Sequence, residues 1–184
     1  MIAEHVDAGF IYYGEVTVNK NPQLQAVRTK AQGLMFVQLR RDSALSRPAM
    51  ADYVIIFHKP GDNEVPIVPD ISNDTWIEWA YPVWNGIREM DTLNPGSGAD
   101  DADERHICPL QLNLIERCVR LWSNPGETVL SPFAGIGSEG YVALKHKRRF
   151  VGVELKPTYW ATACENLARA EAEAATPTLF DDPA

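Results

Sequence analysis

The chain has 184 residues, of which 45% are hydrophobic, and its formal net charge is −8. This length and composition suffice for one buried core, with a second lobe possible. The longest apolar runs, such as Tyr53 to Phe57, are too short to cross a bilayer, and the first residues have neither the basic start nor the apolar stretch of a signal peptide.

The first third of the chain alternates short apolar runs with polar stretches that contain Ser, Pro and Gly. Alternating apolar and polar residues predict strands, and Ser and Pro clusters predict loops. We expect the end of a helix over residues 1–8, strands over Phe10–Asn19, Leu34–Leu39 and Tyr53–His58, a loop over Arg40–Met50 and a linker over residues 61–72.

Charge is distributed unevenly along the chain. The segment from Lys20 to Lys59 contains seven basic and two acidic residues. The segment from Asp62 to Glu104 contains eleven acidic residues and a single basic one, Arg88. A basic segment on an acidic body suits contact with a phosphate backbone, and the alternative is a solvated loop. We predict that double-stranded DNA binds to five of these basic residues, namely Arg28, Lys30, Arg40, Arg41 and Arg47.

The last third combines helices and strands. We expect an acidic loop over Asn94–Asp103 to separate this part from the first. Apolar residues at helical spacing from Leu114 to Trp122 predict a helix whose first turn contains Pro109. We then expect a strand over Thr128–Leu130, a helix over Glu139–His146, a strand over Phe150–Val153 and a helix over Pro157–Ala170.

A Gly-x-Gly-x-x-Gly turn lies between the strand at 128 and the helix at 139. Its first two glycines are Gly135 and Gly137, and Glu154 follows the next strand. Glycines let the backbone approach a ligand, the helix N-terminus offers N–H groups, and an acid about 20 residues on can accept hydrogen bonds from ribose hydroxyls. The pattern predicts a site for an adenosine-containing ligand.

The run Ser131-Pro-Phe-Ala-Gly-Ile-Gly resembles the Asp-Pro-Phe-x-Gly-x-Gly motif of S-adenosylmethionine-dependent DNA amino-methyltransferases, in the permuted class whose catalytic half comes first. Gly152–Tyr159 and His106–Gln111 resemble further elements of that family, and the phage-type group is most similar. The resemblance implies an α/β, Rossmann-like methyltransferase fold. A nicotinamide-dependent oxidoreductase is disfavoured, because its domain would continue with further strands after Glu154.

The resemblance also implies which residues bind S-adenosylmethionine. His106–Gln111 matches the element that forms one wall of the family's cofactor pocket. The implied set is Cys108, Pro109, Leu110, Ser131, Phe133, Ala134, Gly135, Gly137 and Glu154. Ser131 stands where the family has an Asp, and a hydroxyl cannot balance the charge of the cofactor's ammonium group.

The family's Asp/Asn/Ser-Pro-Pro-aromatic tetrapeptide, which accepts hydrogen bonds from the target amine and stacks on the flipped base, is absent from the 184 residues. We therefore expect a chain truncated at its N-terminus, with no catalytic residue of its own and no methylation by itself. A non-catalytic subunit that relies on a partner chain is the alternative. Adenine is preferred over cytosine as the target, in the context of restriction and modification.

The sequence predicts four parts: remaining catalytic-half strands with the basic segment (1–60), an acidic, Trp-rich linker (61–105), the cofactor-binding half (106–172) and a flexible tail (173–184). Cysteines occur at positions 108, 118 and 164, an odd number without Cys-x-x-Cys spacing. We expect no disulfide framework and no metal site, and a cytoplasmic location.

Overall fold

The computed structural model describes residues 1–93 and 109–175. The chain divides into two compact units, one formed by Met1–Asp62 with Ile77–Ile87 and the other by Asn63–Trp76 with Arg88–Ala184. Within the described ranges, no helix is both long and apolar enough to span a membrane.

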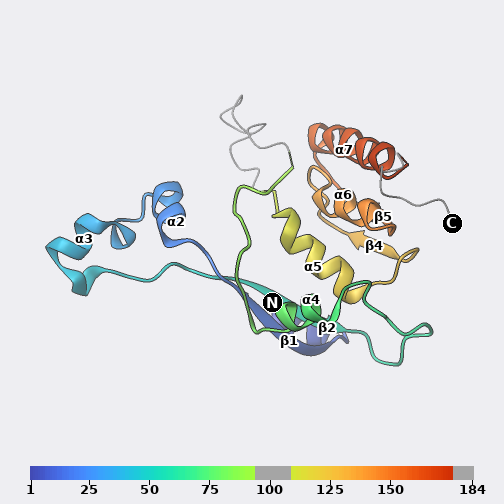
Figure 1. The fold of residues 1–184 in the computed structure, drawn as a ribbon, viewed down its shortest axis with the longest axis horizontal. Coiled ribbons are helices and arrows are strands. Elements are labelled where there is room, and N and C mark those ends of the chain that lie inside the picture. The colour runs from blue at the N-terminus through green and yellow to red at the C-terminus, as the bar shows by residue number, and fades with distance from the viewer. Residues whose placement is uncertain (94–108, 176–184) are drawn as a thin grey trace. The chain divides into compact units, whose positions relative to one another are not determined.

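The first unit contains a three-stranded sheet (Figure 1). Helix α1 (Ile2–Asp7) precedes β1 (Ile11–Val18), which lies between β2 (Asp52–His58) and β3 (Val83–Trp84). Strand β1 runs antiparallel to β2 and parallel to β3. Val18 and Trp84, paired across β1 and β3, are buried almost completely. The helix over residues 1–8 and the strands predicted around 10–19 and 53–58 are confirmed.

Residues 19–51, which we call the arm, connect β1 to β2 by helical pieces. These are α2 (Pro22–Thr29), the 3₁₀ turn η1 (Gln32–Leu34), α3 (Phe36–Arg41) and the 3₁₀ turn η2 (Ser43–Leu45). Asn21 caps α2 by accepting hydrogen bonds from two backbone N–H groups. The strand predicted over Leu34–Leu39 is wrong: Leu34 ends η1, and Phe36–Leu39 belong to α3. After Phe36 and Val37, α3 continues with Gln, Leu and two Arg residues, which favour a helix.

The second unit is built on a parallel pair of strands. It contains α5 (Leu112–Trp122), β4 (Thr128–Ser131), α6 (Ser138–Lys145), β5 (Arg149–Gly152) and α7 (Pro157–Ala175), and α4 (Asn73–Trp79) crosses the boundary between the units. β4 and β5 pair from Thr128–Arg149 to Ser131–Gly152. The predicted strands and the helices around 139 and 157 are confirmed, while the predicted α5 begins at Leu112 rather than at Pro109.

A compact core and one buried ion pair hold this unit together. Side chains from α5, α6 and α7 form the core with Leu93 and Ile136. Arg148 is buried and donates from Nη1 to Asp70 (2.9 Å) and from Nη2 to the carbonyl of Ser123 (2.6 Å). These hydrogen bonds connect the segment around Asp70 to the C-terminal ends of α5 and α6. They stabilise the unit that contains the turn at Gly135.

Candidate functional site

The glycine turn joins the carboxyl end of β4 to the start of α6 (Figure 1). Backbone hydrogen bonds fix its shape: the N–H of Ala134 donates to Val153 (2.9 Å), and the N–H of Gly137 donates to Ala134 (2.8 Å). Gly137 is the N-cap of α6 and has a left-handed φ of 84°. The turn therefore places the first N–H groups of α6, which have no acceptor within the helix, at the end of the parallel strands.

Glu154 lies directly against this turn. Its Oε2 accepts a hydrogen bond from the N–H of Gly135, and its Oε1 accepts one from the N–H of Lys156, both at 2.8 Å. Because a carboxylate offers about four acceptor positions, each oxygen keeps one for a ligand. The structure thus orients the acid that the sequence singled out and leaves it able to bind a diol.

The glycines of this region are not equivalent. A Cβ built on Gly135 (φ 52°) would meet nothing within 4 Å, whereas a Cβ on Gly137 would lie 3.2 Å from the Cβ of Ala163 in α7. At Gly140 it would lie 2.5 Å from the side chains of Leu167 and Phe150. Only Gly135 opens toward free space, so its absent side chain suits a ligand, while Gly137 and Gly140 let α6 pack closely against α7 and β5.

Two large apolar side chains stand exposed at the ends of the strands. Phe133 follows β4 and is 84% exposed, and Leu155 follows β5 and is 94% exposed. Neither contributes to the core, although each lies next to a residue of the turn or beside Glu154. Such side chains can form an apolar cover for a ligand ring.

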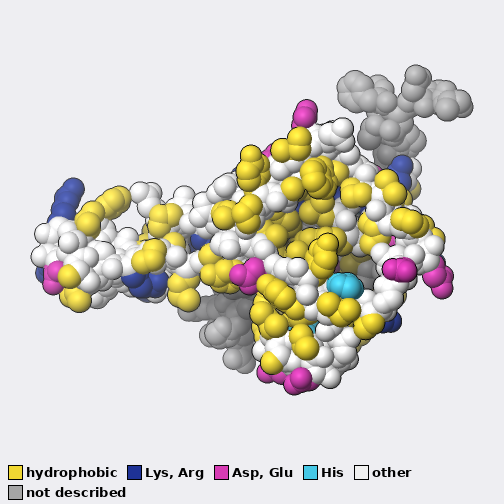
Figure 2. All heavy atoms as spheres, turned by 90° about the horizontal axis from the view of Figure 1, so that it is seen from below, with side chains coloured by type: hydrophobic (Ala, Val, Ile, Leu, Met, Phe, Trp, Pro, Cys, Tyr) yellow, Lys and Arg dark blue, Asp and Glu magenta, His cyan; other side chains and the backbone are white. Residues whose placement is uncertain are grey.

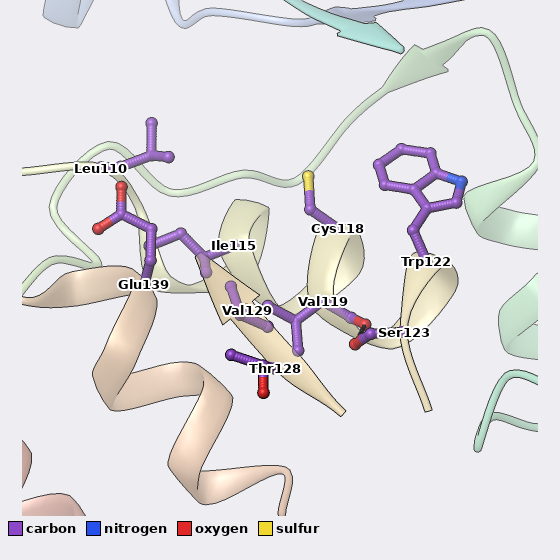
Figure 3. Close-up of a pocket in the computed structure, with 9 residues that line it drawn as sticks. All are labelled: Leu110, Ile115, Cys118, Val119, Trp122, Ser123, Thr128, Val129 and Glu139. Carbon is purple, nitrogen blue, oxygen red and sulfur yellow. Dashed lines mark hydrogen bonds between the residues drawn. The ribbon is translucent and has the colours of Figure 1, made fainter. Parts of the chain in front are cut away.

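A cavity of about 290 Å³ opens between α5 and β4 (Figure 3). Its lining is the apolar face of α5 together with Ser123, Thr128 and Val129, and Leu110 and Glu139 complete one end. Burial raises the pKa of Cys118, which lines the wall, to about 12, so its thiol is neutral at physiological pH. Burial also raises the pKa of Glu139.

Among the predicted cofactor residues, the structure brings Gly135 and Glu154 into direct contact. Ser131 and Ala134 are buried at and just after the end of β4, whereas Pro109 and Leu110 precede α5. His106 and Cys108 lie outside the described residues. The sequence prediction did not include Glu139, which lines the cavity, or the exposed Leu155, although an acid in the first turn of α6 and a large apolar residue after Glu154 were visible signals.

The predicted DNA-binding residues all lie on the arm of the first unit and are exposed. Figure 2 shows Lys and Arg side chains beside apolar ones over the arm, at the left of the view. In that segment the only acid is Asp42, whose carboxylate accepts a hydrogen bond from the N–H of Ala44. Lys20, at the base of the arm, pairs with Asp52. No group of His, Cys, Asp and Glu in the described ranges could hold a metal ion.

Comparisons with known proteins extend over most of the chain. The family model N6_N4_Mtase, described as DNA methylase, matches residues 1–165. The type II methyltransferase M.BglI of Bacillus subtilis is 29% identical over 116 residues, which are 63% of this chain and 30% of that protein. The DNA adenine methyltransferase YhdJ of Escherichia coli is 39% identical over 59 residues, or 32% of this chain and 20% of that protein.

Solved structures share the fold. The protein TTHA0409 of Thermus thermophilus, in a complex with S-adenosyl-L-methionine, has a TM-score of 0.63 and 23% identity, with 92% of this chain and 58% of that chain covered. A second structure of TTHA0409 has a TM-score of 0.64 and 24% identity. The predicted α/β, Rossmann-like fold is therefore confirmed. The chain matches less than a third of the length of the two curated relatives and somewhat over half of TTHA0409.

Proposed function

Because the chain belongs to the DNA methylase family whose model it matches over residues 1–165, we propose that it binds S-adenosylmethionine as the methyl donor for an exocyclic amine of a DNA base. The observation that carries this proposal is the pairing of Glu154 with the N–H of Gly135, on the one glycine of the turn that faces open space. Ribose hydroxyls need an acceptor of this kind next to a backbone that allows close approach. The complex of TTHA0409 with the same cofactor supports the proposal.

In this assignment, five of the predicted residues and Leu155 have distinct tasks. Glu154 accepts the ribose hydroxyls, and Gly135 admits the cofactor to the backbone. Phe133 and Leu155 cover the adenine ring, and Leu110 with Pro109 forms the opposite wall. Bound S-adenosylmethionine would supply the electrophilic methyl group, so the share of this chain is to position the donor and exclude water.

Calorimetric titration of the full chain with S-adenosylmethionine tests the cofactor assignment. The wild type should bind, and Glu154→Gln should lower the affinity by about tenfold or more, since a hydrogen bond to a charged acceptor contributes roughly 1.5–3 kcal/mol. Glu165→Gln, which changes an exposed acid on α7, is the matched control and should bind as the wild type does. Binding of NAD without binding of S-adenosylmethionine would refute the assignment.

We propose double-stranded DNA as the substrate and the exposed basic residues of the arm as its contact surface, namely Arg28, Lys30, Arg40, Arg41 and Arg47. Helix α3 has no buried residue, and Phe36 and Val37 are each 63% exposed. Arg40 and Arg41 lie one turn further along the same helix, so apolar and basic side chains share its faces. A mixed surface of this kind suits phosphates and bases together. Likeness to a DNA adenine methyltransferase supports adenine as the target.

Methyl transfer needs a second component in addition to the bound donor. The amine's lone pair is delocalised into the base until hydrogen-bond acceptors localise it, and the 184 residues contain no Pro-Pro-aromatic tetrapeptide to do so. We propose that this element must be supplied, either on the same polypeptide or by another chain. Transfer of tritiated methyl groups to mixed-sequence DNA should be negligible for residues 1–184 and should appear when a segment with the tetrapeptide is added. Robust transfer by residues 1–184 would contradict this.

A further inference from the structure

Glu139 lies close to the proposed cofactor site but has no role in the contacts proposed above. It lies in the first turn of α6, directly after the glycine turn, and its side chain is half-buried. Figure 3 shows its carboxylate at the same end of the cavity as Leu110, away from Trp122 and Ser123. Glu139 therefore connects the glycine turn with the wall in front of α5.

Among the residues that the structure describes, no other acid lines this cavity. Glu154, the other acid at the turn, does not line the cavity, and its two oxygens accept hydrogen bonds from the N–H groups of Gly135 and Lys156. Ser131, at the end of β4, is 8% exposed and carries no charge. A ligand that brings an ammonium group to this end of the site would thus find its negative partner at Glu139.

The residue after Leu110 carries a further acceptor without a donor in the described part of the chain. Gln111 follows Leu110, is 7% exposed, and its Oε1 accepts no hydrogen bond within the described part of the chain. A buried amide oxygen without a donor costs about 1–3 kcal/mol, so an N–H donor that reached Gln111 would be favoured.

We propose that Glu139 binds the α-ammonium group of S-adenosylmethionine and thereby supplies the negative charge that Ser131 lacks. The proposal rests on the proposed function, since it assigns one end of the same cofactor. The first turn of a helix stabilises a carboxylate through the N-terminal end of the helix dipole, and a charge-assisted hydrogen bond to the ammonium group adds to that. Adenosine is held by Gly135 and Glu154, and the amino-acid end of the cofactor by Glu139.

The test compares Glu139→Gln with the wild type by calorimetry, using S-adenosylhomocysteine and its deaminated analogue, which lacks only the ammonium group. The variant should bind S-adenosylhomocysteine about tenfold to a hundredfold more weakly, which is the loss expected for one charged hydrogen bond. It should bind the deaminated analogue as well as the wild type does. Glu165→Gln is the matched control, and thermal unfolding verifies that each variant is folded.

Equal losses for both ligands, or no loss for either, would overturn the role of Glu139. These outcomes are separate from failure of the proposed function, in which the wild type would bind neither S-adenosylmethionine nor S-adenosylhomocysteine. Glu139→Asp adds an independent measurement: it keeps the charge on a shorter side chain, and its loss for S-adenosylhomocysteine should be smaller than that of Glu139→Gln. A loss equal to or larger than that of Glu139→Gln would also count against an electrostatic role.

Discussion

Replacing each of two neighbouring glycines by alanine should separate cofactor binding from folding. Gly135 and Gly137 both have left-handed backbone angles, with φ of 52° and 84°. An alanine in this region costs about 1–2 kcal/mol at either position. At Gly137 the new Cβ would also lie 3.2 Å from the Cβ and 3.3 Å from the Cα of Ala163, and α7 must move to accept it. Such overpacking adds about 1–3 kcal/mol.

The two variants should therefore differ in opposite directions in two assays. In urea unfolding, Gly135→Ala should lower the free energy of unfolding by about 1–2 kcal/mol and Gly137→Ala by about 2–5 kcal/mol. In calorimetric titration with S-adenosylmethionine, Gly135→Ala should bind at least about tenfold more weakly, because its methyl group occupies the space that the cofactor needs. Gly137→Ala should retain binding under conditions in which it is folded.

Each half of this reasoning can be refuted separately. If Gly135→Ala binds S-adenosylmethionine as the wild type does, the open space beside Gly135 is not where the cofactor approaches. If Gly137→Ala is as stable as Gly135→Ala, the contact with Ala163 does not constrain α7.

Three further predictions concern the arm, the buried ion pair and the cysteines. The double variant Arg40→Gln, Arg41→Gln should reduce the slope of log affinity for duplex DNA against log salt by about 1.8. Lys59→Gln, which changes an exposed basic residue outside the arm, is the control. An equal effect of the two variants would mean that the arm is a solvated loop without DNA contacts. Asp70→Asn should destabilise the chain by about 3 kcal/mol because it leaves the buried Arg148 without its carboxylate, whereas Asp74→Asn should not. Burial alone would raise the pKa of Asp70, but hydrogen bonds and charge from Arg148 and Arg120 outweigh it and lower the pKa. Its stabilisation is complete above the ordinary aspartate pKa of about 3.9 and is lost as the pH falls through the lowered pKa of folded Asp70. Urea unfolding should therefore show the difference between the wild type and Asp70→Asn shrinking as the pH falls below about 3.9. Iodoacetamide should modify the exposed Cys164 well before the half-buried Cys118, and equal rates by mass spectrometry would contradict the raised pKa of Cys118.

The glycine turn and its flanking strands could be predicted from the sequence because their signals are local. Gly135 and Gly137 adopt positive φ angles, which few other residues tolerate, and the apolar runs at 128 and 150 are short and bounded by polar residues. The position of Glu154 relative to the glycine turn is set by the lengths of α6 and β5, which lie between them. These elements depend little on the rest of the chain, so their positions were correct to within about two residues.

The tasks of the individual glycines and of Glu139 could not be predicted in this way. Gly137 and Gly140 are explained by Ala163 and Leu167, which lie on α7 and approach α6 only in the folded chain. Glu139 lines a cavity because residues of α5 and Leu110 lie around the same space. The helix α3 was missed for a related reason, since an exposed apolar run such as Phe36–Leu39 has no buried face to reveal its period.

Holding the methyl donor and preparing the acceptor are separable tasks, and the residues of this chain argue for the first. Gly135, Glu154 and Glu139 account for the two ends of S-adenosylmethionine under our proposals. Orientation of two reactants can contribute about 7–11 kcal/mol to catalysis, but only when both are held in one geometry. If the methyl donor is bound but the amine is not oriented, this contribution to catalysis is absent. The tetrapeptide that orients the amine is therefore the component whose addition should convert a cofactor-binding chain into a methyltransferase, and the proposed cofactor contacts should remain measurable without it.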